Sequence, residues 1–177
     1  VRHILKGHAE VTTGPFYIRG KQNDPDVEPW PYDLARAREL LAEAGWRDSN
    51  GDGLLDRDGQ VFRFKYMYPS GRQTYEQIAK LLKDSAAKVG IDVEPDPIEW
   101  SIFLQRITGR EFQAATMGFG GTIESDPYQN FHSSQIEGNG DNWIGFRNER
   151  VDEIIEVGRR TLDPEKRRSE EHTSELQ

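Results

Sequence analysis

Apolar residues recur at helical spacing in several stretches of the chain. Between Asp33 and Gly45 they occupy positions 34, 37, 40, 41 and 44. Aspartate is typical of a helix N-cap and glycine of a helix C-terminus, so both ends of this stretch are marked. The same spacing predicts further helices at residues 74–89, 100–108 and 149–160.

Apolar and polar residues alternate in "VFRFKYMY" (61–68), which predicts a strand with Phe62, Phe64, Tyr66 and Tyr68 on one face. Shorter strands are expected at "IDVE" (91–94), "FQAATMGF" (112–119) and "WIGF" (143–146). Strand, helix and strand in succession form a βαβ unit with parallel strands and a right-handed crossover. The predicted class is therefore α/β.

The amino-acid composition disfavours some classes of partner and of structure. The 177 residues suffice for one sizeable domain, although two small domains are possible. With 31 acidic and 23 basic side chains the net charge is -8, which disfavours nucleic acid as a partner. Cysteine is absent, so the chain has no disulfides, but this does not fix the compartment.

Both ends of the sequence suggest a piece of a longer protein. The chain begins without Met, and its first residues lack the apolar core of a signal peptide. The last ten residues, "RSEEHTSELQ" (168–177), resemble the translation of a common sequencing-library adapter. We expect 168–177 to be an artefact tail and the natural protein to continue beyond Arg167.

The loop "DSNGDGLLDRDG" (48–59) is similar to the start of a calcium-binding loop, with Asp48, Asn50, Asp52 and Asp56 as candidate ligands. The position that should hold a bidentate carboxylate is Gly59, and the loop joins a helix to a strand rather than to a second helix. Asp, Asn and Gly also suit tight turns. The turn is the favoured interpretation, and a structural calcium ion is the alternative.

Catalytic motifs are missing from the sequence. There is no HExxH or GxSxG, and "GFGG" (118–121) lacks the lysine and the helix of a phosphate loop. No enzyme activity and no cofactor are expected. Ligands of α/β sheets bind beyond the carboxyl ends of strands, where Phe119 and Gly120 would offer an apolar wall and accessible backbone. Phe119 could equally pack in the core.

Two further features are ambiguous. Trp100 and Trp143 could line a ligand site or be partly buried packing groups. The segment Asp126-Pro127-Tyr128 is expected to start a short helix rather than to contact a ligand.

The ordered motifs resemble the peptide/nickel class (family 5) of bacterial extracellular solute-binding proteins, which serve ABC importers. The stretches that carry this resemblance are "YDLARARELLAEAGWRDSNGDGLLDRDG", "IAKLLKDSAAKVGIDVEPDPIEWSIFLQRI", "FQAATMGFGGTIESDPYQNFHSSQ" and "NWIGFRNERVDEIIEVGRRTLDPEKR". They cover nearly all of residues 32–167.

The resemblance implies a two-lobed protein of the periplasmic-binding-protein type II fold that closes on a ligand between its lobes. Residues 33–167 would be most of the second lobe, with a mixed sheet flanked by helices and truncated at both ends. Residues 1–32 would connect it to the first lobe. The family implies export to the periplasm or lipid anchoring outside the cell, a monomer, and docking to a membrane permease.

The resemblance also suggests ligand-binding positions. In the family's oligopeptide binders an aromatic residue lines the cleft, the next residue offers backbone, and an Asp holds the peptide amino terminus; here these positions are Phe119, Gly120 and Thr122. Because Thr122 cannot pair with an ammonium group, Glu124 or Asp126 would have to take that role.

Three more candidates follow from the resemblance. Trp100 matches a cleft-lining tryptophan, Arg106 lies close to a cleft arginine, and Arg72 in "PSGRQT" could bind an anionic group of the ligand. The expected solute is an oligopeptide or a similar extended molecule, with an oligosaccharide or a nickel chelate as alternatives. We expect residues 1–177 alone to bind it weakly, because half of the cleft would be missing.

Overall fold

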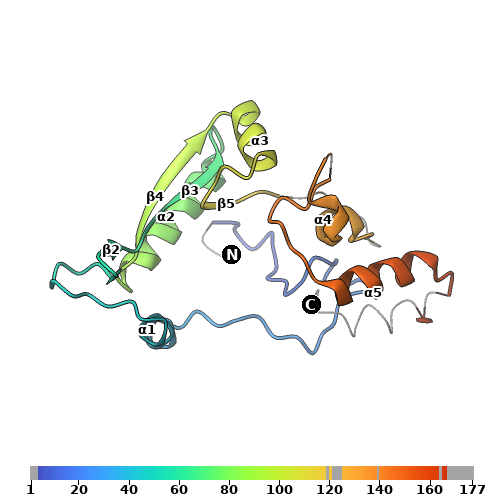
Figure 1. Ribbon diagram of the computed structural model, residues 1–177, viewed down its shortest axis with the longest axis horizontal. Helices are drawn as coiled ribbons and strands as arrows, with labels where there is room; N and C mark the ends of the chain where they lie inside the picture. Colours follow the sequence, from blue (N-terminus) through green and yellow to red (C-terminus); the bar gives the residue numbers. More distant parts are fainter. Residues whose placement is uncertain (1–3, 119, 121–124, 139, 164, 167–177) are drawn as a thin grey trace. The chain divides into compact units, whose positions relative to one another are not determined.

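The computed structural model describes residues 4–118, 120, 125–138, 140–163 and 165–166 (Figure 1). The chain divides into two compact units, which are described separately. Unit 1 comprises Val1–Ala9 and Pro31–Gly118, and unit 2 comprises Glu10–Trp30 and Phe119–Gln177. Among the helices in the described residues, none combines the length and the apolar composition needed to cross a bilayer.

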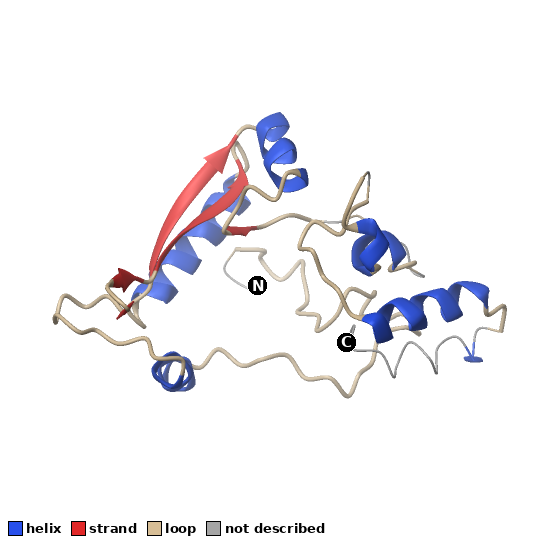
Figure 2. Cartoon of the chain, in the orientation of Figure 1, coloured by secondary structure: helices blue, strands red, loops and turns tan. Residues whose placement is uncertain are grey.

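Unit 1 contains a βαβ unit (Figure 2). Its elements are α1 (Leu34–Glu43), β1 (Asp56–Arg57), β2 (Gln60–Val61), β3 (Arg63–Pro69), α2 (Gln73–Ala87), β4 (Asp92–Ile98), α3 (Trp100–Thr108) and β5 (Ala114–Ala115). β3 pairs in parallel with both β4 and β5, and β1 and β2 form a separate antiparallel hairpin. The predicted helices and the parallel pairing are confirmed.

The core of unit 1 lies on both faces of β3. On one face Phe64, Tyr66 and Tyr68 pack with the apolar stripe of α2, which consists of Tyr75, Ile78, Ala79, Leu82 and Ala86. On the other face Met67 is buried, and α3 contacts the strand and buries Phe103 and Ile107. The alternation of β3 thus places its aromatic side chains on one face, as the sequence predicted, and in the structure α2 covers that face.

β4 is longer than predicted. The expected strand ended at Glu94, but the observed one continues through Pro95 and Pro97 to Ile98. β4 is an edge strand of the described sheet, and its even-numbered residues face its neighbour. Asp92 N donates to Phe62 O, just before β3, at 3.0 Å, and Ile98 O accepts from Ser70 N, just after β3, at 2.8 Å. The two prolines therefore turn their missing N–H groups toward the free edge, where no ladder bond is lost.

Two other strand predictions need correction. Of the strand expected at 112–119, the described residues 112–118 keep only Ala114–Ala115, which pair with β3. The strand expected at 143–146 is wrong, since this segment forms a turn. The side chain of Asn142 bonds both backbone groups of Phe146, accepting from its N–H (2.9 Å) and donating to its carbonyl (2.8 Å). Neither group is then available for hydrogen bonds to a neighbouring strand.

Unit 2 contains α4 (Tyr128–Phe131), the short 3-10 helix η1 (Ser133–Gln135) and α5 (Glu149–Arg160). Its core is a cluster of Phe16, Val151 and Ile155, with Tyr128, Phe131 and Phe146 packed around it. Gln22 is 6% exposed and bonds both the N–H (2.8 Å) and the carbonyl (3.0 Å) of Ser125. Residues of the predicted connecting segment 1–32 thus contribute buried groups to unit 2.

Candidate ligand-binding site

The carboxyl ends of β3 and β4 lie together at one edge of the sheet in unit 1. The N–H of Ser70 donates to the carbonyl of Ile98 at 2.8 Å, so the ladder continues one residue past the end of β3. α2 begins just beyond this point at Gln73, and α3 begins at Trp100. This is the edge at which ligands of α/β sheets bind.

Trp100 is placed at this edge by the start of α3. The N-cap is Glu99, whose carboxylate accepts from the N–H groups of Ser101 (2.8 Å) and Ile102 (3.4 Å). A hydrogen bond from the Ser101 hydroxyl, reinforced by these backbone bonds, lowers the pKa of Glu99. Trp100 is 51% exposed and stacks on Phe103, with ring centroids 5.8 Å apart at 14°. One surface of the indole is therefore covered, and much of the rest is open to a ligand.

Arg72 occupies the N-cap position of α2, directly after the turn at Gly71, whose φ is +79°. It is exposed, and its carbonyl accepts from Tyr75 N at 3.0 Å. Within the described residues no carboxylate forms an ion pair with its guanidinium. Arg72 and Trp100 thus follow the ends of neighbouring strands, β3 and β4.

Arg106 lies in different surroundings. It lines a hollow of about 290 Å³ with Lys65, Met67, Asp96, Glu111, Phe112 and Gln113, and neither Arg72 nor Trp100 lines that hollow. Its Nη1 atom is 3.6 Å from Asp96 Oδ2. The structure therefore gives Arg106 an acidic neighbour of its own and does not join it to Trp100.

The remaining candidates fall in unit 2. Phe119, Thr122 and Glu124 lie outside the described residues, and Gly120 is exposed. Asp126 is exposed but engaged, since one carboxylate oxygen accepts from Tyr128 N (3.0 Å) and the other is 3.2 Å from Arg159 Nε. A ligand ammonium group would have to compete with Arg159 for Asp126. The short helix predicted after Asp126 is confirmed as α4.

The loop 48–59 uses its side chains to close turns. Asp48 accepts from the N–H groups of Gly51 (2.7 Å) and Gly53 (2.9 Å), and Asp52 accepts from Leu54 N (2.8 Å). The bond from Leu54 is the main reason why the pKa of Asp52 is lowered, and a second bond from Asn50 adds to it. In the part of the chain that the structure describes, no three His, Cys, Asp or Glu residues gather as metal ligands. This geometry supports the turn interpretation.

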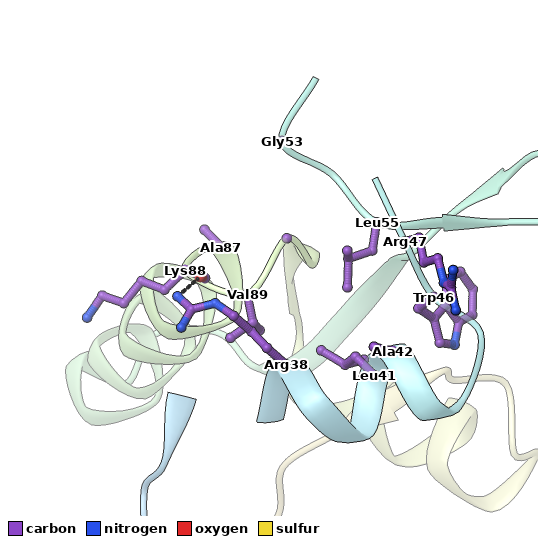
Figure 3. Close-up of a pocket in the computed structure, with 11 residues that line it drawn as sticks. Arg38, Leu41, Ala42, Trp46, Arg47, Gly53, Leu55, Ala87, Lys88 and Val89 are labelled. Atoms are coloured by element: carbon purple, nitrogen blue, oxygen red, sulfur yellow. Dashed lines mark hydrogen bonds between the residues drawn. The ribbon is translucent and has the colours of Figure 1, made fainter. Parts of the chain in front are cut away.

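A second hollow, of about 400 Å³, was not anticipated from the sequence (Figure 3). It lies between α1, the end of α2 and the 53–55 segment, and Leu41, Ala42, Leu55 and Val89 contribute apolar walls. Arg38 donates from Nη2 to the carbonyl of Lys88 at 2.7 Å, which links α1 to the C-terminal end of α2. Arg38 is on the polar side of the helical pattern, so periodicity gave no sign of this contact.

Comparison with known proteins agrees with this architecture. Residues 1–142 match the family model "Bacterial extracellular solute-binding proteins, family 5 Middle". The chain is 34% identical over 167 residues to the oligopeptide-binding protein AppA of Bacillus subtilis, covering 92% of this chain and 31% of that protein. The solved structure of AppA in complex with a nonapeptide matches with a TM-score of 0.87 and 32% identity, over 97% of this chain and 35% of that one.

More distant solved structures share the fold. They include NikZ of Campylobacter jejuni in complex with Ni(L-His), with a TM-score of 0.82, 24% identity and coverage of 97% of this chain and 34% of that one. A mannohexaose-bound oligopeptide-binding protein of Thermotoga maritima matches with a TM-score of 0.83 and 22% identity over the same shares of the two chains. The chain spans about a third of the length of these relatives. It belongs to family 5 of the bacterial extracellular solute-binding proteins.

Proposed function

We propose that the chain is part of the solute-binding subunit of an ABC importer, and that this subunit binds an oligopeptide or a similar extended solute. The observation that carries the proposal is the match to the family 5 model, joined to 34% identity with an oligopeptide-binding protein. Residues 33–167 would form most of the second lobe.

The edge of unit 1 that carries Trp100 and Arg72 supports a ligand-binding role. An indole that is 51% exposed offers an apolar surface to a peptide side chain. A guanidinium without a carboxylate partner in the described chain suits a carboxylate of the ligand, which it can hold with two parallel hydrogen bonds. We assign these two residues to solute contact.

The backbone contacts and the amino-terminal contact are assigned to unit 2. Phe119 and Gly120 would supply an aromatic wall and accessible backbone. Between the two acidic candidates for a ligand ammonium, we favour Glu124, because Asp126 is already paired with Arg159 at 3.2 Å. Arg106 lies beside Asp96 in a separate hollow, and from there it would contribute its positive charge to the ligand site.

Binding in this proposal is reversible and involves no covalent chemistry. Closure of two lobes on the solute would create the surface that docks to the membrane permease. The subunit would act as a monomer in the periplasm or attached to the outside of the cell by a lipid.

The test is a thermal-shift screen of a protein of the relatives' full length, obtained by extending the gene upstream of Val1 and downstream of Arg167. The ligands are peptides of two to nine residues, oligosaccharides and nickel–histidine. A ligand at about 100 times its Kd stabilises the folded state by about 2.7 kcal/mol, which gives a clear rise in Tm.

A rise with peptides alone is expected. A rise only with sugars or the nickel complex would keep the solute-binding function and overturn the peptide assignment. No rise with any member of the panel would contradict the proposed solute classes.

A further inference from the structure

His132 in unit 2 is a buried titratable group to which the proposed function assigns no role. It lies between α4 and η1 and is 7% exposed. Its ring packs on Tyr128, with ring centroids 4.5 Å apart. Because histidine can gain a charge near neutral pH, its burial at this position needs a structural explanation.

The hydrogen bonds define the tautomer of this ring. The backbone N–H of Ser134 donates to Nδ1 at 3.1 Å, so Nδ1 is an acceptor and the ring proton resides on Nε2. The Ser134 hydroxyl oxygen is also 2.8 Å from Nδ1. Neutral His132 is therefore the N-cap of η1, in the manner of an Asn or Asp side chain.

The other side of the ring faces α5. Nε2 is buried without a hydrogen-bond partner among the described residues, and Glu156 Oε1 lies 3.5 Å from it. Glu156 also pairs with Arg160 at 2.9 Å. Its carboxylate favours a proton on Nε2 in both states of the ring, and Arg160 screens part of that attraction.

Two further charged groups are close to this turn. Arg159 covers the ring of Tyr128 at 4.1 Å, and Tyr128 Oη is 3.1 Å from the Ser134 hydroxyl oxygen. Asp152 of α5 accepts from Ser133 N at 2.8 Å and from the Ser133 hydroxyl. The η1 turn therefore has two acceptors for its first amides, the carboxylate of Asp152 and Nδ1 of His132.

We propose that residues 132–136 form a proton-sensitive turn, which is closed when His132 is neutral and opens when its ring is protonated. An imidazolium has two N–H donors and no acceptor, so it cannot receive the Ser134 amide. The protonated Nδ1 can still donate to the Ser134 hydroxyl oxygen, but the amide loses its partner. Asp152 continues to hold Ser133, which confines the opening to the following residues.

The first test reads the tautomer directly. Nitrogen NMR of the whole 177-residue chain, labelled with 15N-histidine, is expected to show a non-protonated Nδ1 for His132 at about pH 8, well above the ordinary histidine range. A protonated Nδ1 at this pH would overturn the proposal, because the Ser134 amide would then have no acceptor in the closed turn.

The second test follows the Ser134 amide. Its hydrogen-exchange protection factor, corrected for intrinsic exchange, is expected to fall about tenfold between about pH 8 and about pH 5, which is the effect of losing one hydrogen bond. His132→Asn keeps an acceptor for η1 but cannot titrate, so its protection should not fall. His8→Asn, which changes an exposed histidine of unit 1, should behave as the wild type.

The proposal can be tested even if His132→Asn cannot be used, and a second variant tests the assigned cap. If His132→Asn fails to fold, the wild-type titration alone decides, since unchanged protection at the two pH values contradicts the proposal. Glu156→Gln leaves the η1 cap intact and removes the carboxylate that faces Nε2. In this variant the Ser134 amide should therefore stay protected at about pH 8, and a loss of protection there would contradict the assigned cap.

Discussion

The two units of the chain are stabilised in different ways. In unit 1 a parallel sheet is covered by helices whose apolar stripes point inward, and Val93 and Phe103 are fully buried. In unit 2 the small cluster around Val151 is joined by a network of side chains that bond to the backbone. Asn142, also fully buried, is the clearest member of that network. Unit 1 is thus stabilised mainly by periodic apolar faces that pack together. Much of unit 2 is stabilised by individual hydrogen bonds from side chains to the backbone.

This difference explains which parts of the fold could be predicted. In unit 1 the alternation of β3 and the helical spacing of α2 appear directly in the sequence, and both predictions are confirmed. In unit 2 the segment 143–146 reads as a strand by its composition, yet Asn142 turns it into a loop. Side-chain hydrogen bonds to distant backbone have no period, so a pattern analysis cannot detect them.

The residues of the candidate site also differ in how far the sequence could place them. Trp100 and Arg72 were candidates because of the resemblance to family 5, and in the structure they follow the carboxyl ends of β4 and β3. The pairing of Asp126 with Arg159 joins residues 33 positions apart and has no local signal. The hollow beside Arg38 was missed because it depends on how α1 meets the end of α2.

The largest effect is expected from removing core volume in unit 1. Phe103→Ala should lower the free energy of unfolding by about 3–5 kcal/mol, because it leaves a cavity under α3. The measurement is urea denaturation followed by circular dichroism. Ile102→Ala, at a neighbouring position that is 47% exposed, is the matched control and should cost less than about 1 kcal/mol. Equal losses would mean that α3 does not cover the sheet.

The second-largest loss of stability is expected from removing a buried polar side chain from unit 2. Asn142→Ala leaves the carbonyl groups of His132 and Phe146 and the N–H of Phe146 without this partner. A loss of about 3 kcal/mol is expected by the same denaturation assay. Asn130→Ala in α4 should change stability by about 0.5 kcal/mol or less. If both variants were equally stable, the polar network would not hold unit 2.

A smaller effect is expected at the start of α1. Asp33 accepts from the N–H groups of Ala35 (2.8 Å) and Arg36 (3.0 Å). Asp33→Ala should destabilise the helix by about 1 kcal/mol, and Asp33→Ser should restore most of the loss. Hydrogen exchange of residues 34–43 measures this locally. Failure of serine to rescue protection would show that the cap is not the cause.

The smallest effect concerns pH and the 48–59 loop. The pKa of Asp52 is lowered, chiefly by the hydrogen bond from Leu54 N, so folding favours the ionised carboxylate. The turn is then complete at neutral pH and opens only as the pH falls through the lowered pKa of Asp52. NMR titration of the Leu54 amide should show this, and Asp52→Asn, which keeps an acceptor, should abolish the pH dependence. Asp58→Asn is the control.

Calorimetric titration of a nonapeptide into the full-length protein tests the proposed peptide-binding site most directly. The wild type should bind, and Trp100→Ala should bind about tenfold or more weakly, because a stacked aromatic contact is worth roughly 1–3 kcal/mol with its apolar area. Trp30→Ala, which changes a 97% exposed residue of unit 2, should bind as the wild type. Equal affinity of the wild type and Trp100→Ala would contradict the site, and a wild type that binds no peptide would contradict the proposed function.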